Sequence, residues 1–426
     1  MMRKSCLKRV VLLFAGCFLW NISLGACAAL SLDEAVAMAL NQNPQIKIAA
    51  KGEEKAAANL NAAKGANGFS ISASSKFSIS DGADQIYTNG NSNGITASMP
   101  LYTGGKNELN IDSKKDAITT SELNTARTQE NIVLDTIKAY YDILEAKKTV
   151  DVDQESVDNY QAHLTNVQQL YAAGSKARVE VLRSDVELSN ARQTLIKAQN
   201  SYDIAVSTLK NIIKMDRDEP LSLTDDFSYR VFDKDLYSCL DYAMVNRKDL
   251  QAAKLAVSVA ERDIDIAAAD KKPQVDVSVS TSWDKQVLPS SSDYNYTAGV
   301  SASWNLFDSN VTNSNIKAAK VAVEEATLEL EKEQDDVDLA VRQAYLNMKE
   351  AEKRFTSTAN AIKQAQEDNY IANEKYKAGE GLMLDIIDAQ LALSTAQLNY
   401  ISAQYDYARY KATLENVMGL RDGVTK

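Results

Sequence analysis

The sequence predicts a mainly α-helical protein with a membrane β-barrel portion, built twice from one unit. Three observations lead to this fold class: an internal repeat, helical patterns much longer than those of compact domains, and four segments in which apolar and small polar residues alternate. Each unit is expected to contain a helix, two strands, a very long helix and a shorter return helix.

The repeat covers nearly the whole chain at an offset of 204–205 residues. Tyr171 and Gly174 align with Tyr376 and Gly379, for example. Chance similarity between helices does not keep one register over such a distance, so the chain is duplicated. The expected divisions are a signal peptide (1–28), a first repeat (29–215), an equatorial linker (216–233), a second repeat (234–420) and a C-terminal tail (421–426).

The composition argues against several classes of protein. The chain has 426 residues, with 58 Asp and Glu against 47 Lys and Arg and a net charge of −11, whereas a nucleic-acid partner requires a basic surface. One histidine, His163, and four cysteines leave little material for a Cys/His metal site or a histidine-based catalytic triad. We expect no enzymatic activity, no cofactor and no nucleic-acid partner.

The first 28 residues have the pattern of an export signal. Four basic residues precede an apolar stretch at residues 10–20, and Ala26, Cys27 and Ala28 fit a cleavage site. A membrane-anchoring helix is the alternative, but the apolar stretch is short for one. Removal of this leader would leave a net charge of −15 and one cysteine, Cys239, which we expect to be a small buried residue on a helix.

Two helical hairpins are expected, at residues 111–215 and 316–420. Their apolar residues recur at alternating spacings of three and four, which is the pattern of a coiled-coil seam. The first rod, from Ile111 to Tyr171, has 61 residues and would be roughly 90 Å long. A compact domain has no place for such a rod, so we expect it to span a gap.

Four segments have the pattern of strands: 69–80, 94–102, 274–284 and 294–307. One side of each is apolar and the other is rich in Ser, Thr and Asn, which is typical of transmembrane β-barrel strands. Outward-facing loops are expected at 81–93 and 285–293. The alternative, a soluble sheet packed on a core, is weaker because no separate domain is left to cover the apolar side.

Four strands cannot close a barrel, and lipid does not tolerate an open sheet edge. Two chains would supply eight strands, whose interior fills with side chains, whereas three would supply twelve and leave a lumen. We therefore expect a homotrimer in which a 12-stranded β-barrel continues into a trimeric α-helical barrel, with helices leaving the membrane into the periplasm.

From residue 31 to 420 the sequence resembles the TolC-like outer membrane efflux protein family. The resemblance is carried by residues 100–105 (PLYTGG), 305–308 (NLFD) and the two helical tips at 171–182 and 376–389. It implies a homotrimeric exit duct in contact with outer membrane lipid. It also implies as partners a periplasmic adaptor and an inner-membrane pump of the RND, ABC or MFS type.

This topology bears on Cys27, which also stands in a lipoprotein-like sequence. The first helix, expected at 32–67, ends where the first strand enters the membrane, so its start lies roughly 50 Å from the bilayer. The few residues between Cys27 and this helix reach about 17 Å at most. Lipidation of Cys27 is therefore disfavoured.

The resemblance assigns a periplasmic gate to the second helical tip. Asp385 and Asp388 match a ring of aspartates, and their spacing places them on one helical face. Tyr376 matches a latch tyrosine, and Glu180 occupies the place of its acidic partner. Without the resemblance, the two aspartates would be read as solvated acids, and Tyr376 as an ordinary seam residue.

A second latch of the family has no counterpart in this chain. Gly381 stands where the family has an arginine, and Val179 replaces its hydroxyl partner. Lys176 and Arg178 are candidates to substitute for it. We expect a less securely closed tip.

The two tip turns are expected to form the adaptor contact. Gly174 and Gly379 each follow a rod and are expected to take the left-handed conformation that ends a helix. The predicted contact residues are Gly174, Ser175, Gly379, Gly381 and Leu382.

Two other functions remain open on the residues alone. A structural tether would use the rods to hold the outer membrane at a distance, without a conducting pore. A soluble coiled-coil interaction protein would leave the alternating strands unexplained. The polar side of the strands and the acids at the tip favour the conduit.

Overall fold

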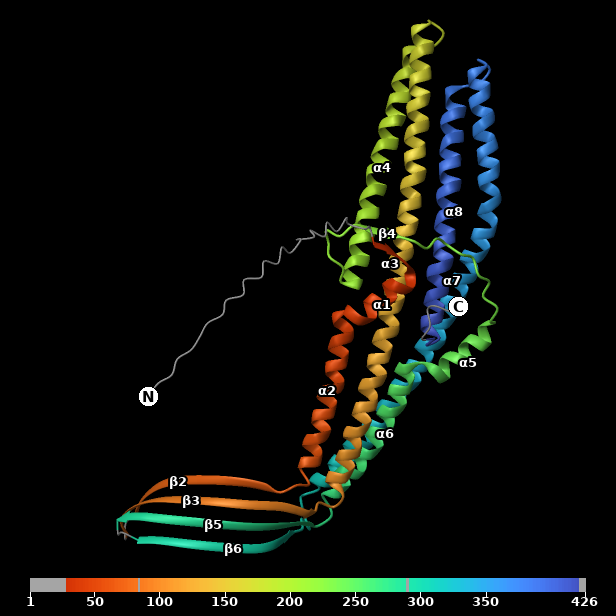
Figure 1. Ribbon diagram of the computed structural model, residues 1–426. Coiled ribbons are helices and arrows are strands. Elements are labelled where there is room, and N and C mark those ends of the chain that lie inside the picture. Colours follow the sequence, from red (N-terminus) through yellow and green to blue (C-terminus); the bar gives the residue numbers. More distant parts are fainter. Residues whose placement is uncertain (1–27, 83–84, 289–290, 421–426) are drawn as a thin grey trace, which may run out of the picture.

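The computed structural model describes residues 28–82, 85–288 and 291–420. A long body of helices extends from one end of a four-stranded sheet, and a linker crosses this body near its middle (Figure 1). The expected leader, except Ala28, lies outside the described residues, as do Cys27 and the expected tail. Among the helices that the structure describes, none has a stretch long and apolar enough to cross a bilayer.

Each repeat begins with two helices, not with the single helix expected at 32–67. Helix α1 (Leu32–Gln42) ends at Asn43, and α2 (Pro44–Gly65) follows at once. Pro44 has no N–H to donate and disfavours helical backbone in the residue before it, so the chain turns there. The second repeat has the same break at Arg247, between α5 (Leu236–Asn246) and α6 (Lys248–Ala269), although no proline is present.

The two rods are equal in length. Helices α3 (Lys106–Ala172) and α7 (Val311–Lys377) have 67 residues each, or about 100 Å. Both begin five residues before the predicted starts of the hairpins, after the left-handed residues Gly105 and Asn310. The return helices are α4 (Arg178–Ile213) and α8 (Met383–Val417). The matching order and length of the elements show the internal duplication.

The four long strands form one antiparallel sheet in the order β2-β3-β5-β6. Their bounds are Ser70–Gly82 (β2), Gln85–Tyr102 (β3), Gln274–Leu288 (β5) and Ser291–Ser303 (β6). The loops expected at 81–93 and 285–293 are therefore largely strand, because cross-strand pairing continues through these polar segments. Strand β6 ends at Ser303 instead of 307, where the indole of Trp304 donates to the carbonyl of Lys271 at 2.9 Å.

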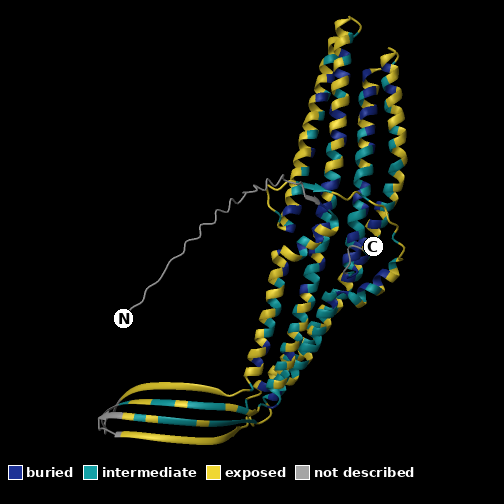
Figure 2. Cartoon of the chain, in the orientation of Figure 1, coloured by how far each residue is buried: buried dark blue, intermediate teal, exposed yellow. Residues whose placement is uncertain are grey.

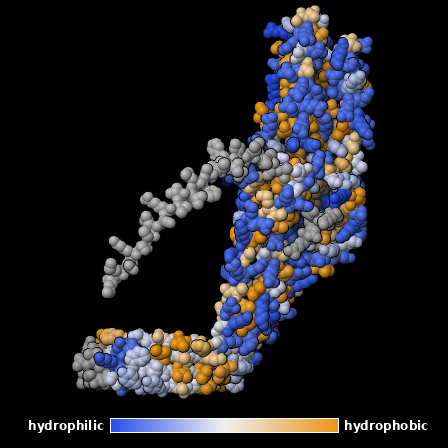
Figure 3. Space-filling model, in the orientation of Figure 1, coloured by the Kyte–Doolittle hydropathy of each residue, from blue (hydrophilic) through white to orange (hydrophobic). Residues whose placement is uncertain are grey.

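The register gives the sheet two different sides, since directly paired residues point the same way. One row of paired residues is polar and consists of Ser72, Thr96, Ser280 and Thr297. The next row is apolar and consists of Ile71, Ala97, Val279 and Ala298. Ile71 and Val279 are 66% and 55% exposed, so no other part of the chain that the structure describes covers them (Figure 2). Figure 3 shows apolar side chains on the part of the sheet nearest the helices.

The linker joins the repeats at the middle of the helical body. Its strand β4 (Leu221–Leu223) pairs in parallel with β1 (Ala28–Leu30). The buried Tyr140 of α3 donates to the carbonyl of Leu30 and accepts the backbone N–H of Asp225. Cys239 is fully buried on α5, as expected from the sequence. The main core therefore lies around this linker, between the sheet and the tips.

Candidate functional site at the helical tips

The two tip turns are built alike. Gly174 and Gly379 have φ angles of 74° and 81°, the left-handed conformation expected of them. The N–H groups of Ser175 and Glu380 then reach back to the carbonyls of Leu170 and Lys375, at 2.9 and 3.0 Å. This pattern satisfies carbonyls that a helix end otherwise leaves open, so each rod can stop sharply.

A hydrogen bond joins the two hairpins at their tips. The hydroxyl of Tyr376 on α7 donates to Oε2 of Glu180 on α4 at 3.0 Å. Tyr376 is only 2% exposed, and its burial together with the Glu180 carboxylate raises the pKa of its phenol. The hydroxyl therefore stays protonated and able to donate. The structure thus brings together the two residues that the sequence assigned to the latch.

Lys176 completes this arrangement. Its Nζ lies 3.6 Å from Oε2 of Glu180 and 4.5 Å from the ring centroid of Tyr376. The ammonium thus contacts both members of the pair, one as an ion pair and the other through its aromatic face. It was one of two residues considered as a substitute for the missing second latch.

Gly381 lies against the backbone of the latch residue. A Cβ atom at this position would stand 2.9 Å from the backbone nitrogen of Tyr376 and 3.1 Å from the carbonyl carbon of Lys375. A larger residue there would therefore displace the turn. An arginine at this position, as in the family's second latch, would therefore not fit the turn as it stands.

The two aspartates lie in the first two turns of α8. Both are exposed on the chain. Oδ2 of Asp385 also accepts the backbone N–H of Leu382 at 3.0 Å, so this residue caps the helix. The sequence analysis missed this capping role. The signal for it was the position of Asp385, three residues after the residue that precedes the helix.

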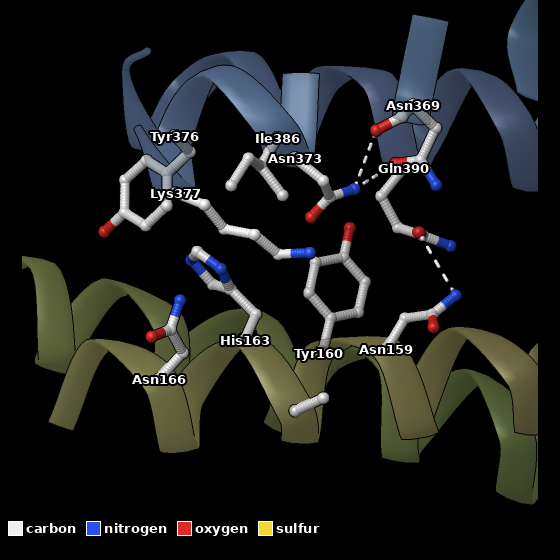
Figure 4. Close-up of a pocket in the computed structure, with 11 residues that line it drawn as sticks. Asn159, Tyr160, His163, Asn166, Asn369, Asn373, Tyr376, Lys377, Ile386 and Gln390 are labelled. Carbon is white, nitrogen blue, oxygen red and sulfur yellow. Dashed lines mark hydrogen bonds between the residues drawn. The ribbon is translucent and has the colours of Figure 1, made fainter. Parts of the chain in front are cut away.

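A residue that the sequence analysis did not assign to the site lies beside the latch. His163 of α3 is 9% exposed, and its ring centroid is 5.3 Å from that of Tyr376. Both rings border a cavity of about 430 Å³ between α3, α7 and α8 (Figure 4). The cavity has an amide-rich lining that includes Asn159, Asn166, Asn369, Asn373 and Gln390. The sequence drew attention to His163 only because it is the single histidine of the chain.

The tips also expose apolar side chains. Leu382 is 68% exposed, and on α4 Val179 and Leu182 are 61% and 54% exposed. No group of three or more His, Cys, Asp or Glu among the described residues is placed to hold a metal ion. The tips therefore combine a hydrogen bond between the two hairpins with exposed apolar side chains.

Comparison with known proteins places this geometry in a family. The sequence model of the outer membrane efflux protein family matches residues 35–213 and 239–420. Outer membrane protein TolC of Escherichia coli K12 is 22% identical over 363 residues, covering 79% of this chain and 73% of TolC. The alkaline protease secretion protein AprF of Pseudomonas aeruginosa is 23% identical over 323 residues, covering 72% of this chain and 65% of AprF.

Solved structures have the same fold. The Campylobacter jejuni CmeC outer membrane channel superposes with a TM-score of 0.80 at 16% identity, over 91% of this chain and 85% of CmeC. The outer membrane protein VceC of Vibrio cholerae gives 0.77 at 16% identity, over 91% of this chain and 96% of VceC. With a family match over most of both repeats, this chain belongs to the outer membrane efflux protein family.

Proposed function

We propose that three copies of this chain form a passive exit duct across the outer membrane and the periplasm. The duct receives substrates from an inner-membrane pump of the RND, ABC or MFS type through a periplasmic adaptor. The open four-stranded sheet with one uncovered apolar side carries this proposal.

The edges of the sheet determine the assembly. Strands β2 and β6 are the end strands, so each has one edge without a partner among the described strands. Unpaired backbone groups are too costly in lipid, and the barrel must close with strands from other copies. Three copies supply twelve strands and leave a lumen, which the Ser and Thr rows would line.

The helices carry a matching signal. Apolar side chains are exposed along α4 at Val186, Ile196 and Ile204, and along α7 at Leu339 and Leu346. A neighbouring copy that covers these residues would continue the helical body into a closed tube. The barrel and the tube would then share one threefold axis.

We place the gate of this duct at the periplasmic tips. In a trimer, Asp385 and Asp388 gather six carboxylates at the narrow end, a field that attracts cations and repels anions. The bond between Tyr376 and Glu180 joins the tips of the two hairpins of each chain. Opening requires these hairpins to separate.

The adaptor surface is proposed at the two tip turns. It comprises Gly174, Ser175, Gly379, Gly381 and Leu382. A Cβ atom at Gly174 or Gly379 would meet no atom within 4 Å, so both turns leave open space for a partner. Two similar turns per chain in a trimer offer six similar docking places.

The tether considered from the sequence is not supported by the comparisons. Among the similar proteins, CmeC is an outer membrane channel and AprF is a secretion protein. A tether also gives no reason for the polar side of the sheet, to which Ser280 and Thr297 belong.

Single-channel recording of reconstituted protein tests the duct and its gate. Wild type is expected to conduct with a preference for cations, and a variant with Asp385→Asn and Asp388→Asn to lose most of that preference while still conducting. Asp335→Asn serves as the matched control, because Asp335 is also an aspartate but lies on α7 far from the tip. Absence of current in all variants would contradict the duct, and unchanged selectivity would contradict the acidic ring.

A further inference from the structure

The only histidine of the chain lies beside the latch and is not used by the gate as described above. Atom Nε2 of His163 is buried and has no hydrogen-bond partner among the residues that the structure describes. Buried polar atoms are nearly always hydrogen-bonded, so a buried nitrogen without a partner requires an explanation. The ring lies next to Tyr376 at the cavity between α3, α7 and α8 (Figure 4).

Charged and titratable groups face this ring from each neighbouring element. They are Glu180 of α4, Lys176 of the turn between α3 and α4, Tyr376 and Lys377 of α7, and Tyr160 of α3. Asp388 of α8 interacts electrostatically with Tyr160. Burial lowers the pKa of His163, Glu180 opposes this effect, and Lys176 adds to it. The imidazole is therefore neutral while the tip is closed near neutral pH.

We propose that His163 is an acid sensor that opens the tip when its imidazole gains a proton. The imidazolium attracts the Glu180 carboxylate, which belongs to the same hairpin. It thereby competes with the Tyr376 hydroxyl of the other hairpin for the Glu180 carboxylate, which accepts the hydrogen bond between the two tips. The new charge also lies beside a ring that already holds the ammonium of Lys176 against its face. The inference rests on the gate proposed above and identifies the signal that operates it.

The direction of the pH effect follows from linkage. The closed tip lowers the pKa of His163 below the value of about 6.5 that an exposed histidine has, so the closed tip binds fewer protons than the open one. The contact between the two hairpin tips is fully present above about pH 6.5 and is lost as the pH falls toward the lowered pKa of His163. Each unit of pKa difference between the two states changes their ratio tenfold.

The test measures the distance between the tips directly. Spin labels at Ser175 and Glu380, both exposed, mark the two turns in a Cys239→Ala background. Labelled chains are diluted with unlabelled ones so that only distances within a chain are measured. In wild type, the distance should increase between about pH 7.5 and about pH 5. His163→Phe keeps a ring against Tyr376 and His163→Gln keeps a polar side chain, but neither can be protonated, so both should stay closed.

In protein without a histidine tag, a histidine-specific isotope label gives one NMR signal. This signal should shift over the same pH range in which the distance between the spin labels increases. Equal separation in the wild type and both variants would overturn the proposal and assign the acid response to Asp385 and Asp388. Tips that stay together while the signal titrates would also overturn it. Separation without a change in pore current would support the sensor and contradict the proposed gate.

Discussion

Tyr376 makes a hydrogen bond between the two hairpin tips. It is almost fully buried, donates to Glu180, and packs against His163 and Lys176. A hydrogen bond to a charged group contributes about 1.5–3 kcal/mol. The closed tip should therefore be sensitive to the loss of this single hydroxyl.

Replacement of Tyr376 by Phe should raise the open probability of the pore more than tenfold, because it removes the bond between hairpins and keeps the ring. Single-channel recording measures the effect. Tyr370→Phe is the matched control, since Tyr370 lies on the same helix and is 62% exposed. Equal open probabilities for Tyr376→Phe and wild type would show that the bond does not hold the gate.

Single residues differ in how far the sequence reveals them. The left-handed turns at Gly174 and Gly379 follow from a glycine at the end of a helix, which is a local rule. The contact between Tyr376 and Glu180 was expected only through the family resemblance. The place of His163 was not predicted, because the side of α3 that faces α7 depends on how two distant hairpins pack.

At the scale of elements, the sheet has one apolar and one polar side. Alternation along the chain predicted both sides, whereas cross-strand pairing determined the lengths of the strands. Residues 85–93 contain Asn, Gly and Ser, which favour turns locally, yet β3 pairs through them with β2. The break at Arg247 between α5 and α6 was likewise not predicted, because no proline marks it.

Neighbouring residues on β5 test which side meets lipid. Val279→Lys should destabilise the barrel by about 2–4 kcal/mol if this residue lies near the bilayer midplane. Ser280→Lys, one residue further on, points to the other side and should instead change ion selectivity. Urea unfolding in lipid vesicles measures both variants. A larger loss of stability for Ser280→Lys would mean that the two sides are assigned the wrong way round.

At the scale of the whole molecule, residues 28–82, 85–288 and 291–420 together expose two unpaired strand edges, an uncovered apolar sheet side and apolar residues along α4 and α7. The proposed assembly accounts for all of these features, because other copies of the chain would cover them. The duplication predicted from the sequence fits this account, because two similar halves in each of three chains give a nearly sixfold tube.

The number of copies in one particle tests this account most directly. Native mass spectrometry of the protein released from detergent should give a single species with three times the chain mass. A particle of one chain would contradict the shared barrel, and a particle of two chains would leave eight strands and no lumen.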